Sequence, residues 1–294
     1  MTLLDTAPAP TAAPVARTVH RDRLFPGDRA ASYVLLVLLG LVTVLPLLYM
    51  LALSLQSDAE VFAGEPVLWP AEPQWDNFVR LFEAAPFGRF FLNSLIMAGA
   101  ITIAHLVFDP LVGYVFAKFD FPGKRIAFVA VLSTLMVPFF VRMLPIYAIF
   151  SNLGWIDTYQ GLIVPFLMDA YGIFLMRQFI QPLPDELIEA ARVDGASELR
   201  IYLQIILPQC KPALSVLALL TFVFQWNEFL WPLIATSTTE MRTMPIGLTL
   251  FNQEYFTQWN LTAAGALILF VPTALFFVVT QKFLVEGISL SGLK

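Results

Sequence analysis

Residues Pro184 to Pro212 read PDELIEAARVDGASELRIYLQIILPQCKP, and this stretch decides how the chain is organised. It lies between two long apolar runs, yet its first half is rich in charged residues and its apolar residues recur at helical spacing. Asp194-Gly195 divides it, because glycine ends helices at little cost and accepts a left-handed turn. We therefore expect two short helices that meet at an angle across the end of a membrane bundle. We call residues 185–206 the elbow; its polar corner and apolar face suit the grip of another protein.

The composition of the whole chain is that of a membrane protein. Of its 294 residues, 58% are hydrophobic and only 13% are charged, whereas charged residues make up about a quarter of a soluble domain. Apolar runs of about 20 residues, the length that crosses a bilayer, recur along the sequence. The single cysteine, Cys210, excludes an internal disulfide and a CxxC metal site, and we expect it to be a small buried apolar residue.

The apolar runs predict an all-α, polytopic membrane fold. Residues 1–31, rich in Ala, Pro and Thr and then in Arg, are expected to form a disordered tail, and residues 32–294 a transmembrane domain. Six transmembrane helices are expected at about 32–55, 90–117, 126–150, 159–180, 212–236 and 262–282. Each contains a proline, which removes a backbone donor and kinks a helix. A proline in every span favours a bundle that bends or opens, although membrane helices also tolerate proline without such a role.

The positive charges orient these spans. Thirteen of the 17 Lys and Arg residues lie in the tail, the 118–125 loop, the elbow with its edges, and the C-terminus. The opposite loops hold only Arg80 and Arg242, while Arg89 lies at the edge of a span and Arg142 within one. Because Lys and Arg favour the cytoplasmic side of a membrane, we expect both termini and the elbow to be cytoplasmic.

Catalytic signals are missing from the sequence. It has no G-x-x-x-x-G-K-[ST] phosphate loop, no H-E-x-x-H or G-x-S-x-G motif, and no clustered Cys/His ligand set. We therefore expect no enzymatic activity and no metal site, and a membrane-embedded enzyme is disfavoured. If the protein does energy-driven work, a partner must handle the ATP.

The elbow carries a specific motif. The pattern E-A-A-x3-G-x9-I-x-L-P occupies residues 189–208. This is the EAA signature, and with it the chain resembles the membrane-spanning permease subunits of bacterial ABC importers. The flanking segments FLMRQF (174–179), FQWNEFLWPL (224–233) and TMPIGL (243–248) resemble the carbohydrate-uptake group, the maltose-type permeases. The resemblance covers roughly residues 30–290.

The resemblance implies partners for this chain. It would be one half of a heterodimeric permease in the cytoplasmic membrane of a bacterium or archaeon, together with a second permease subunit, two ATPase subunits and an extracytoplasmic solute-binding protein. ATP and Mg²⁺ would be bound by the ATPase partners, with no cofactor in this chain and no nucleic-acid partner. In such importers the elbow sits in a cleft of the ATPase, and the residues implied in this coupling are Glu189, Ala190, Ala191, Asp194, Gly195, Leu207 and Pro208. An ordinary amphipathic interfacial helix is the alternative.

Polar residues within the spans are expected to mark the path of the solute. A charged side chain at mid-bilayer costs roughly 2.5–3.5 kcal/mol and needs a partner or a wet cavity. Carboxylates, amides and aromatic rings suit a polyol such as a sugar; a salt bridge of Arg142 with Asp169 or Glu228 that only fixes helix packing explains the charges equally well. The residues concerned are Arg142, Tyr147, Asp169, Trp226, Asn227, Glu228 and Trp231.

The last outer loop, residues 237–261, carries a cluster of aromatic residues. The resemblance implies that this loop docks the solute-binding protein, although its rings would also serve as an interfacial belt. The aromatic residues are Phe251, Tyr255, Phe256 and Trp259.

His105 and Asp109 are four residues apart and share one face of the second span. They allow a structural hydrogen bond or a proton relay, and ATP-driven import needs no relay. Two rival functions stay open. The same machine would carry glycerol phosphate or a glycerophosphodiester if its path held more cations than Arg142. An ion-driven secondary transporter would use His105, Asp109 and Asp169 as proton sites, and would leave the elbow without a use.

Overall fold

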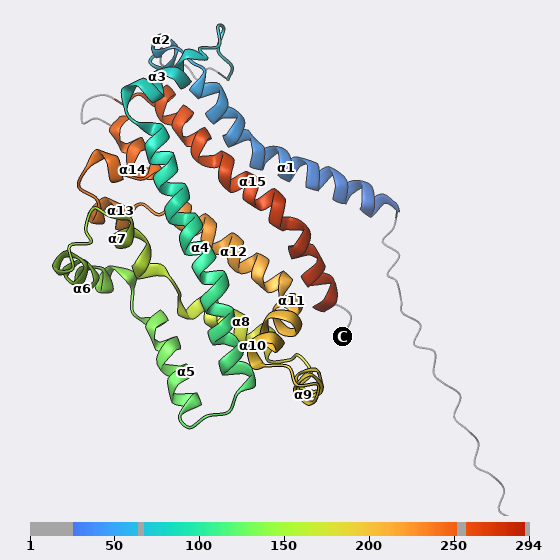
Figure 1. Cartoon of the computed structure of the whole chain (residues 1–294). Coiled ribbons are helices and arrows are strands. Elements are labelled where there is room, and N and C mark those ends of the chain that lie inside the picture. Colours follow the sequence, from blue (N-terminus) through green and yellow to red (C-terminus); the bar gives the residue numbers. More distant parts are fainter. Residues whose placement is uncertain (1–25, 64–67, 252–256, 292–294) are drawn as a thin grey trace, which may run out of the picture. The chain divides into compact units, whose positions relative to one another are not determined.

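The computed structural model describes residues 26–63, 68–251 and 257–291, with side chains described from Ala30 to Phe283 (Figure 1). Within these ranges the chain is helical apart from short connections, which confirms the all-α prediction. It divides into two compact units, Met1–Leu48 and Tyr49–Lys294. In chain order the elements are α1 (Pro26–Ser54), α2 (Asp58–Val61), α3 (Asp76–Ala84), α4 (Phe87–Lys118), α5 (Lys124–Ser133), η1 (Thr134–Met136), α6 (Phe139–Asn152), α7 (Tyr159–Ile163), η2 (Val164–Phe166), α8 (Ala170–Ile180), α9 (Glu186–Val193), α10 (Glu198–Ile201), η3 (Tyr202–Ile206), α11 (Leu207–Gln209), α12 (Lys211–Trp226), α13 (Leu230–Ala235), η4 (Thr239–Met241), α14 (Met244–Leu248), η5 (Thr249–Phe251) and α15 (Trp259–Ser291).

The first helix, α1, begins at Pro26, within the expected tail, and its candidate membrane span, Ala30–Ser54, agrees with the predicted span at about 32–55. Proline is favourable at the first helical position, because the N–H that it lacks would have no helical partner there. Residues 1–25 of the expected tail lie outside the described residues. From Tyr33 to Leu48 nearly all the large apolar side chains of α1 are exposed, which is typical of a helix that faces lipid or another protein.

Within the described residues, three helices are long and apolar enough to cross a membrane unbroken: Ala30–Ser54 of α1, α4, and Trp259–Phe283 of α15. Three further spans are reached only when the two halves of a bent pair are counted together. The pair α5/α6 bends by 100°, the pair α7/α8 by 42°, and the helices on either side of Cys210 by 80°. The first two pairs correspond to the predicted spans 126–150 and 159–180, while the third joins the end of the elbow to α12, and α12 and α13 cover the predicted span 212–236.

Each of these breaks has a proline at or beside it, and the 80° bend at Cys210 lies between Pro208 and Pro212. Pro138 lies at the 100° bend, and Pro165 lies in η2 beside the 42° bend. Pro46, Pro110 and Pro272 instead sit inside helices that continue through them. A proline alone therefore does not interrupt a span of this chain, because neighbouring groups in a membrane bundle can satisfy the carbonyl that it frees.

The helix α4 is the centre of the second unit. It packs against α8 and α12, and α12 packs in turn against α15 (Figure 1). The approach of α8 is close at Gly113, where a Cβ atom would lie 2.9 Å from Cβ of Met176. Small residues allow membrane helices to approach in this way. As a result α4 carries His105 and Asp109 into the middle of the bundle, where both side chains are buried.

The elbow forms the two short helices that the sequence predicts, α9 and α10. Between them Gly195 has a φ of +80°, in the left-handed region where glycine pays no steric cost. Ser197 precedes α10, and its hydroxyl oxygen accepts a hydrogen bond from the Arg200 N–H. The chain then continues through a π-helical turn, η3, and α11 toward Cys210, which is fully buried as expected.

Candidate functional site

A cavity of about 610 Å³ lies among α4, α6, α8 and α12. Its lining combines aromatic rings with polar side chains, and a mainly apolar hollow with a few polar groups is the common form of a small-molecule site. The rings are those of Phe139, Phe140, Phe166 and Phe224, and the polar side chains are those of His105, Arg142, Asp169, Tyr171, Thr221, Gln225 and Glu228.

Three of the residues predicted for the solute path line this cavity: Arg142, Asp169 and Glu228. No ion pair joins Arg142 to either carboxylate in the described part of the chain. The packing salt bridge that the sequence allows is therefore not formed in this conformation, and the guanidinium is left beside the cavity.

The two carboxylates of the cavity also hold helix ends. Asp169 precedes α8, and its Oδ1 accepts a hydrogen bond of 2.7 Å from the Gly172 N–H. Glu228 precedes α13, and its Oε1 accepts hydrogen bonds of 3.0 and 3.1 Å from the N–H groups of Leu230 and Trp231. A carboxylate at a helix N-terminus satisfies N–H groups that lack helical partners. Both side chains are therefore fixed at the cavity wall by the backbone that follows them.

Trp226 and Trp231 do not line the cavity, which corrects their predicted place on the solute path. Both side chains are fully buried. The indole N–H of Trp226 donates to the Leu269 carbonyl at 2.8 Å, and that of Trp231 donates to the Gly161 carbonyl at 3.0 Å. A buried tryptophan needs a partner for its N–H, and in both cases the backbone supplies it. These two residues pack the bundle.

Tyr147 and Asn227 also lie off the cavity wall. Tyr147 is half-buried and packs against the apolar cluster that includes Trp231. Asn227 follows the last residue of α12, and its amide donates to the Val223 carbonyl at 2.7 Å. The Asn227 side chain therefore satisfies its own helix end in this conformation.

Three polar lining residues were not predicted from the sequence: Tyr171, Thr221 and Gln225. Gln225 is 5% exposed, and its Oε1 has no hydrogen-bond partner among the described residues. A buried oxygen without a partner is costly, and a solute hydroxyl or a water molecule would satisfy it. The available signal was helical spacing, since Thr221 and Gln225 are four residues apart on one face of α12.

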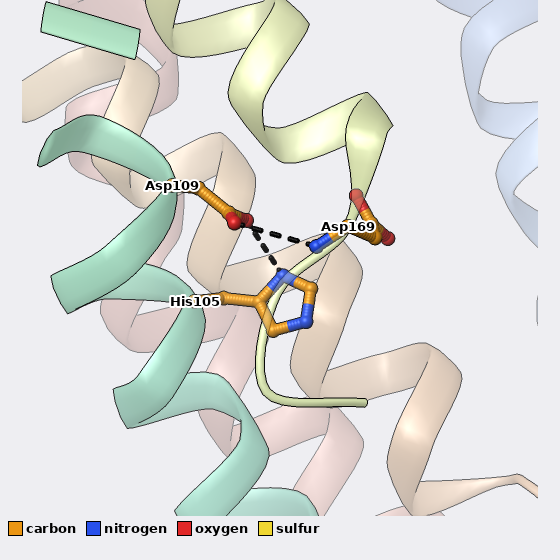
Figure 2. A group of neighbouring side chains, drawn as sticks. All are labelled: His105, Asp109 and Asp169. Carbon is orange, nitrogen blue, oxygen red and sulfur yellow. Dashed lines mark hydrogen bonds and ion pairs between the residues drawn. The ribbon is translucent and has the colours of Figure 1, made fainter. Parts of the chain in front are cut away.

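His105, Asp109 and Asp169 form a compact polar group at the edge of the cavity (Figure 2). His105 Nδ1 lies 2.8 Å from Asp109 Oδ2, so the predicted contact between these two residues is present. His105 Nε2 lies 2.9 Å from the Phe166 carbonyl oxygen. The Asp169 N–H donates to Asp109 Oδ1 at 3.4 Å. Carboxylate and imidazole atoms converge here as in a metal site, but both ring nitrogens already contact protein atoms.

The elbow presents an exposed apolar surface. Val193 is 88% exposed and Leu199 is 63% exposed, one on each side of the Gly195 turn. Large apolar side chains gathered on a surface mark a site of interaction. Of the residues implied in coupling, Ala191 is buried in the core cluster and Leu207 is half-buried, while the exposed ones are Glu189, Ala190, Asp194, Gly195 and Pro208. Ala191 thus packs within the chain, and the exposed residues are available to a partner.

An ion pair closes the elbow turn. Arg192 Nε lies 2.6 Å from Glu198 Oε1, which joins α9 to α10 across Gly195. The Glu198 carboxylate also accepts a hydrogen bond of 3.3 Å from the Tyr114 hydroxyl group on α4. These contacts connect the exposed turn to the central helix.

A family model described as the binding-protein-dependent transport system inner membrane component matches residues 110–288. The match takes in more than half of the chain, including the elbow, α8 and α12. The chain belongs to this family. It is therefore a permease component of a transport system rather than an enzyme.

Relatives of this permease agree with the assignment. The arabinooligosaccharides transport system permease protein of Bacillus subtilis is 34% identical over 269 residues, which cover 90% of this chain and 96% of that protein. The sn-glycerol-3-phosphate transport system permease protein of Yersinia pestis bv. Antiqua is 34% identical over 264 residues, which cover 87% of this chain and 94% of that protein.

A solved structure shows the same fold. It is that of a bacterial ABC transporter involved in the import of the acidic polysaccharide alginate, with a TM-score of 0.76 and 24% sequence identity. The match covers 88% of this chain and 98% of that one. The predicted fold of an ABC importer permease is thereby confirmed.

The predicted docking loop of this permease, residues 237–261, has fewer exposed aromatic side chains than expected among its described residues. Phe251 is 4% exposed, and its ring stacks on that of Phe87 with 5.4 Å between the ring centroids. Trp259 is 49% exposed. Tyr255 and Phe256 lie outside the described residues. Phe251 is therefore a core residue, and among the described members of the set Trp259 is the one on the surface.

Proposed function

We propose that this permease imports a carbohydrate across the cytoplasmic membrane, as one half of a heterodimer in an ABC importer. The observation that carries the proposal is the cavity, where Asp169, Gln225 and Glu228 lie together with aromatic rings. Carboxylates and an amide can bond the hydroxyl groups of a sugar, and rings can cover its apolar faces. The similar arabinooligosaccharides transport system permeases support the same class of cargo.

The charges of the cavity favour a neutral cargo over an anion. Among the lining residues, all of them described, Arg142 is the only Lys or Arg, and it is opposed by the carboxylates of Asp169 and Glu228. A phosphate group would meet more negative than positive charge there. Glycerol phosphate stays a second candidate because the similar protein of Yersinia pestis is named for that cargo.

The elbow of each permease subunit is proposed to bind one ATPase partner, so that the transporter contains two ATPase partners. Val193 and Leu199 offer them apolar surface, and the exposed Glu189 offers a carboxylate for charge-assisted hydrogen bonds. ATP and Mg²⁺ would bind to those partners. Their closure would press the two elbows together and switch the spans to face outward, and hydrolysis would reset them.

The distribution of Lys and Arg supports a cytoplasmic position for the elbow and both termini. A solute-binding protein would then deliver the cargo from the other side, near Trp259 at the start of α15. The membrane would be the cytoplasmic membrane of a bacterium or archaeon.

Uptake by cells that lack the gene tests the cargo. We expect loss of uptake of one class of oligosaccharide, restored by the wild-type chain, with unchanged uptake of glycerol 3-phosphate. Loss of glycerol 3-phosphate uptake alone would assign the second candidate. Unchanged uptake of every sugar tested and of glycerol 3-phosphate would contradict both.

A charge reversal in the elbow tests the grip. We expect Glu189→Lys to lower both the uptake and the amount of ATPase that copurifies with the permease. Glu186→Lys, in the first turn of α9 and outside the EAA motif, is the matched control. Equal copurification of the ATPase with the two variants would contradict the proposed grip.

A further inference from the structure

The interruption of the fourth span leaves backbone groups that need partners. Between η2, which ends at Phe166, and α8, which begins at Ala170, the backbone departs from the helix, and Asp169 has an extended conformation. In a continuous helix the Phe166 carbonyl would accept from the Ala170 N–H, and the Asp169 N–H would donate to the Pro165 carbonyl. Within a membrane such groups must be satisfied by protein or by water in a cavity.

The neighbouring helix α4 satisfies both groups with two side chains one turn apart. His105 Nε2 lies 2.9 Å from the Phe166 carbonyl oxygen, at one end of the interruption. Asp109 Oδ1 accepts from the Asp169 N–H at 3.4 Å, at the other end. Figure 2 shows His105 and Asp109 pointing from α4 toward the start of α8. The pair therefore grips the interruption on both sides.

The geometry requires the pair to hold one shared proton. A carbonyl oxygen only accepts, so His105 Nε2 carries a hydrogen. Nδ1 of the same ring then faces Asp109 Oδ2 at 2.8 Å, and two lone pairs cannot meet at that distance, so one proton lies between them. Either an imidazolium faces a carboxylate or a neutral imidazole faces a carboxylic acid. In both forms the pair is neutral overall.

The packing seals Asp109 from water. The Asp109 side chain is fully buried, and Gly172 of α8 lies so close that a Cβ atom there would be 1.9 Å from Asp109 Oδ2. Glycine at this position lets α8 approach the carboxyl group. No space for a chain of water molecules is left on that side, as transfer of a proton onward through Asp109 would need.

The contacts of His105 and Asp109 with the interruption determine the position of Asp169. Its N–H is held by Asp109, and its Oδ1 is held by the Gly172 N–H, while the side chain lines the cavity. We propose that His105 and Asp109 act as a neutral clamp that positions the interruption of the fourth span and thereby fixes Asp169 at the cavity wall. The clamp rests on the proposed function in so far as the cavity is the path of the solute. Both are positioning residues, and neither is a proton relay or a metal ligand.

Two substitutions of Asp109 separate the clamp from a relay. In Asp109→Asn the amide oxygen can still accept from the Asp169 N–H and the amide N–H can donate to Nδ1 of a neutral His105, so the clamp persists without a movable proton. Asp109→Leu keeps a branched shape of larger volume and removes both bonds. We expect Asp109→Asn to keep uptake within about twofold of the wild type and Asp109→Leu to lower it at least about tenfold, as the loss of buried hydrogen bonds implies.

The complete transporter, with its partner subunits, is the sample. Equal copurification of the ATPase and equal basal ATP hydrolysis would show that both variants assemble. Adding Asp169→Ala to Asp109→Leu should cost little more than either single change, because both act through the same carboxylate. Loss of uptake in Asp109→Asn equal to that in Asp109→Leu would overturn the clamp in favour of a relay. A chelator of divalent cations can be added to permease vesicles that are supplied with Mg·ATP on the ATPase side. Loss of all uptake under these conditions would overturn the clamp in favour of a metal site.

A thiol at the cavity wall gives a readout that does not depend on the cargo. Met168 lines the cavity beside Asp169 and is 46% exposed, while the native Cys210 is buried. The test uses a chain that carries Met168→Cys and Cys210→Ala, so that a maleimide labels the introduced thiol. We expect the labelling rate to be the same whether residue 109 is Asp or Asn. With Asp109→Leu we expect the labelling rate to change by at least about threefold. Equal rates in all three would overturn the clamp, even if the cargo assigned above is wrong.

Discussion

Lys118, the last residue of α4, forms an ion pair of 2.6 Å with Asp185, where the elbow begins. Its ammonium group also donates to the carbonyl oxygens of Gln181 and Leu183, and the side chain is only 4% exposed. One buried cation thus ties the connection between α8 and the elbow to the central helix. If the elbow receives the motion of an ATPase, Lys118 lies on the route by which that motion reaches the bundle.

We expect Lys118→Met to weaken this connection, because two carbonyl groups and Asp185 lose a common donor. The expected loss is about 1–3 kcal/mol in the free energy of unfolding, measured as a lower thermal midpoint of the purified complex, with reduced uptake per ATP hydrolysed. Lys118→Arg keeps the charge and should cost less. Asp185→Asn should cost still less, because the Asp185 side chain is 71% exposed and exposed ion pairs contribute about 0–1 kcal/mol. Lys118→Met with wild-type stability and coupling would contradict the role.

The turn at Gly195 gives a second prediction. Among the described residues, no atom other than those of Gly195 and its two chain neighbours lies within 4 Å of the position that a Cβ would take. Within this chain, any cost therefore comes from the φ of +80°. A left-handed conformation costs roughly 1–2 kcal/mol for an ordinary residue and less for asparagine. We expect Gly195→Ala to lower ATPase copurification and uptake, and Gly195→Asn to do so less. Equal effects of the two would assign the defect to a clash with a partner.

The buried tryptophans should be separable from the cavity residues. Trp226→Phe and Trp231→Phe each remove a hydrogen bond to a backbone carbonyl, so we expect a loss of about 1 kcal/mol in stability and little change in the rate of uptake relative to the amount of assembled complex. Asp169→Asn and Gln225→Leu should do the reverse, lowering uptake while the thermal midpoint changes little. A tryptophan variant with normal stability and altered cargo preference would contradict this division.

Asp157 should make one contact between two connecting segments sensitive to acid. Its Oδ1 accepts hydrogen bonds from the N–H groups of Ser237 and Thr238, at 2.8 and 3.0 Å. Burial acts to raise the pKa of Asp157, but these bonds together outweigh it, and the pKa lies below its ordinary value. A lowered folded-state pKa means that the stabilisation is complete above the unfolded value of about 3.9 and is lost as the pH falls through the folded value.

Hydrogen exchange of the Ser237 and Thr238 amides measures this contact. We expect their protection, corrected for the intrinsic rate, to hold at neutral pH and to fall only in acid. Asp157→Asn keeps an acceptor oxygen, and asparagine tolerates the φ of 63° found at this position. Its protection should therefore be independent of pH. Acid-sensitive protection that persists in Asp157→Asn would assign the effect to another group.

The elbow could be predicted from the sequence because its signals are local. Asp194-Gly195 marks a turn whatever surrounds it, and charged residues inside an apolar chain mark a segment outside the bilayer. The contact between His105 and Asp109 was foreseeable for the same reason, since residues four apart meet on any helix. Local geometry, however, does not say that Phe166 and Asp169 complete the group, because they come from a distant part of the chain.

The cavity could be predicted only in part. The spans are apolar all round, so periodicity does not show which face meets other helices and which faces a hollow. Trp226 and Gln225 are neighbours in the sequence, yet the tryptophan packs the core and the glutamine lines the cavity. Polar character alone pointed to Arg142, Asp169 and Glu228 but also to Asn227, whose amide is used by its own helix. Deciding among them required the packing of α12 against α4 and α15.

The exposed apolar surface at Val193 and Leu199 has a consequence for how the amount of this subunit in the cell is matched to the amount of its partner. If the elbow is cytoplasmic and binds an ATPase, as proposed, a copy made in excess of that ATPase would expose this apolar surface to the proteases and chaperones of the cytoplasm. We expect unassembled copies to be degraded faster than assembled ones, so that the abundance of the ATPase limits the abundance of the permease.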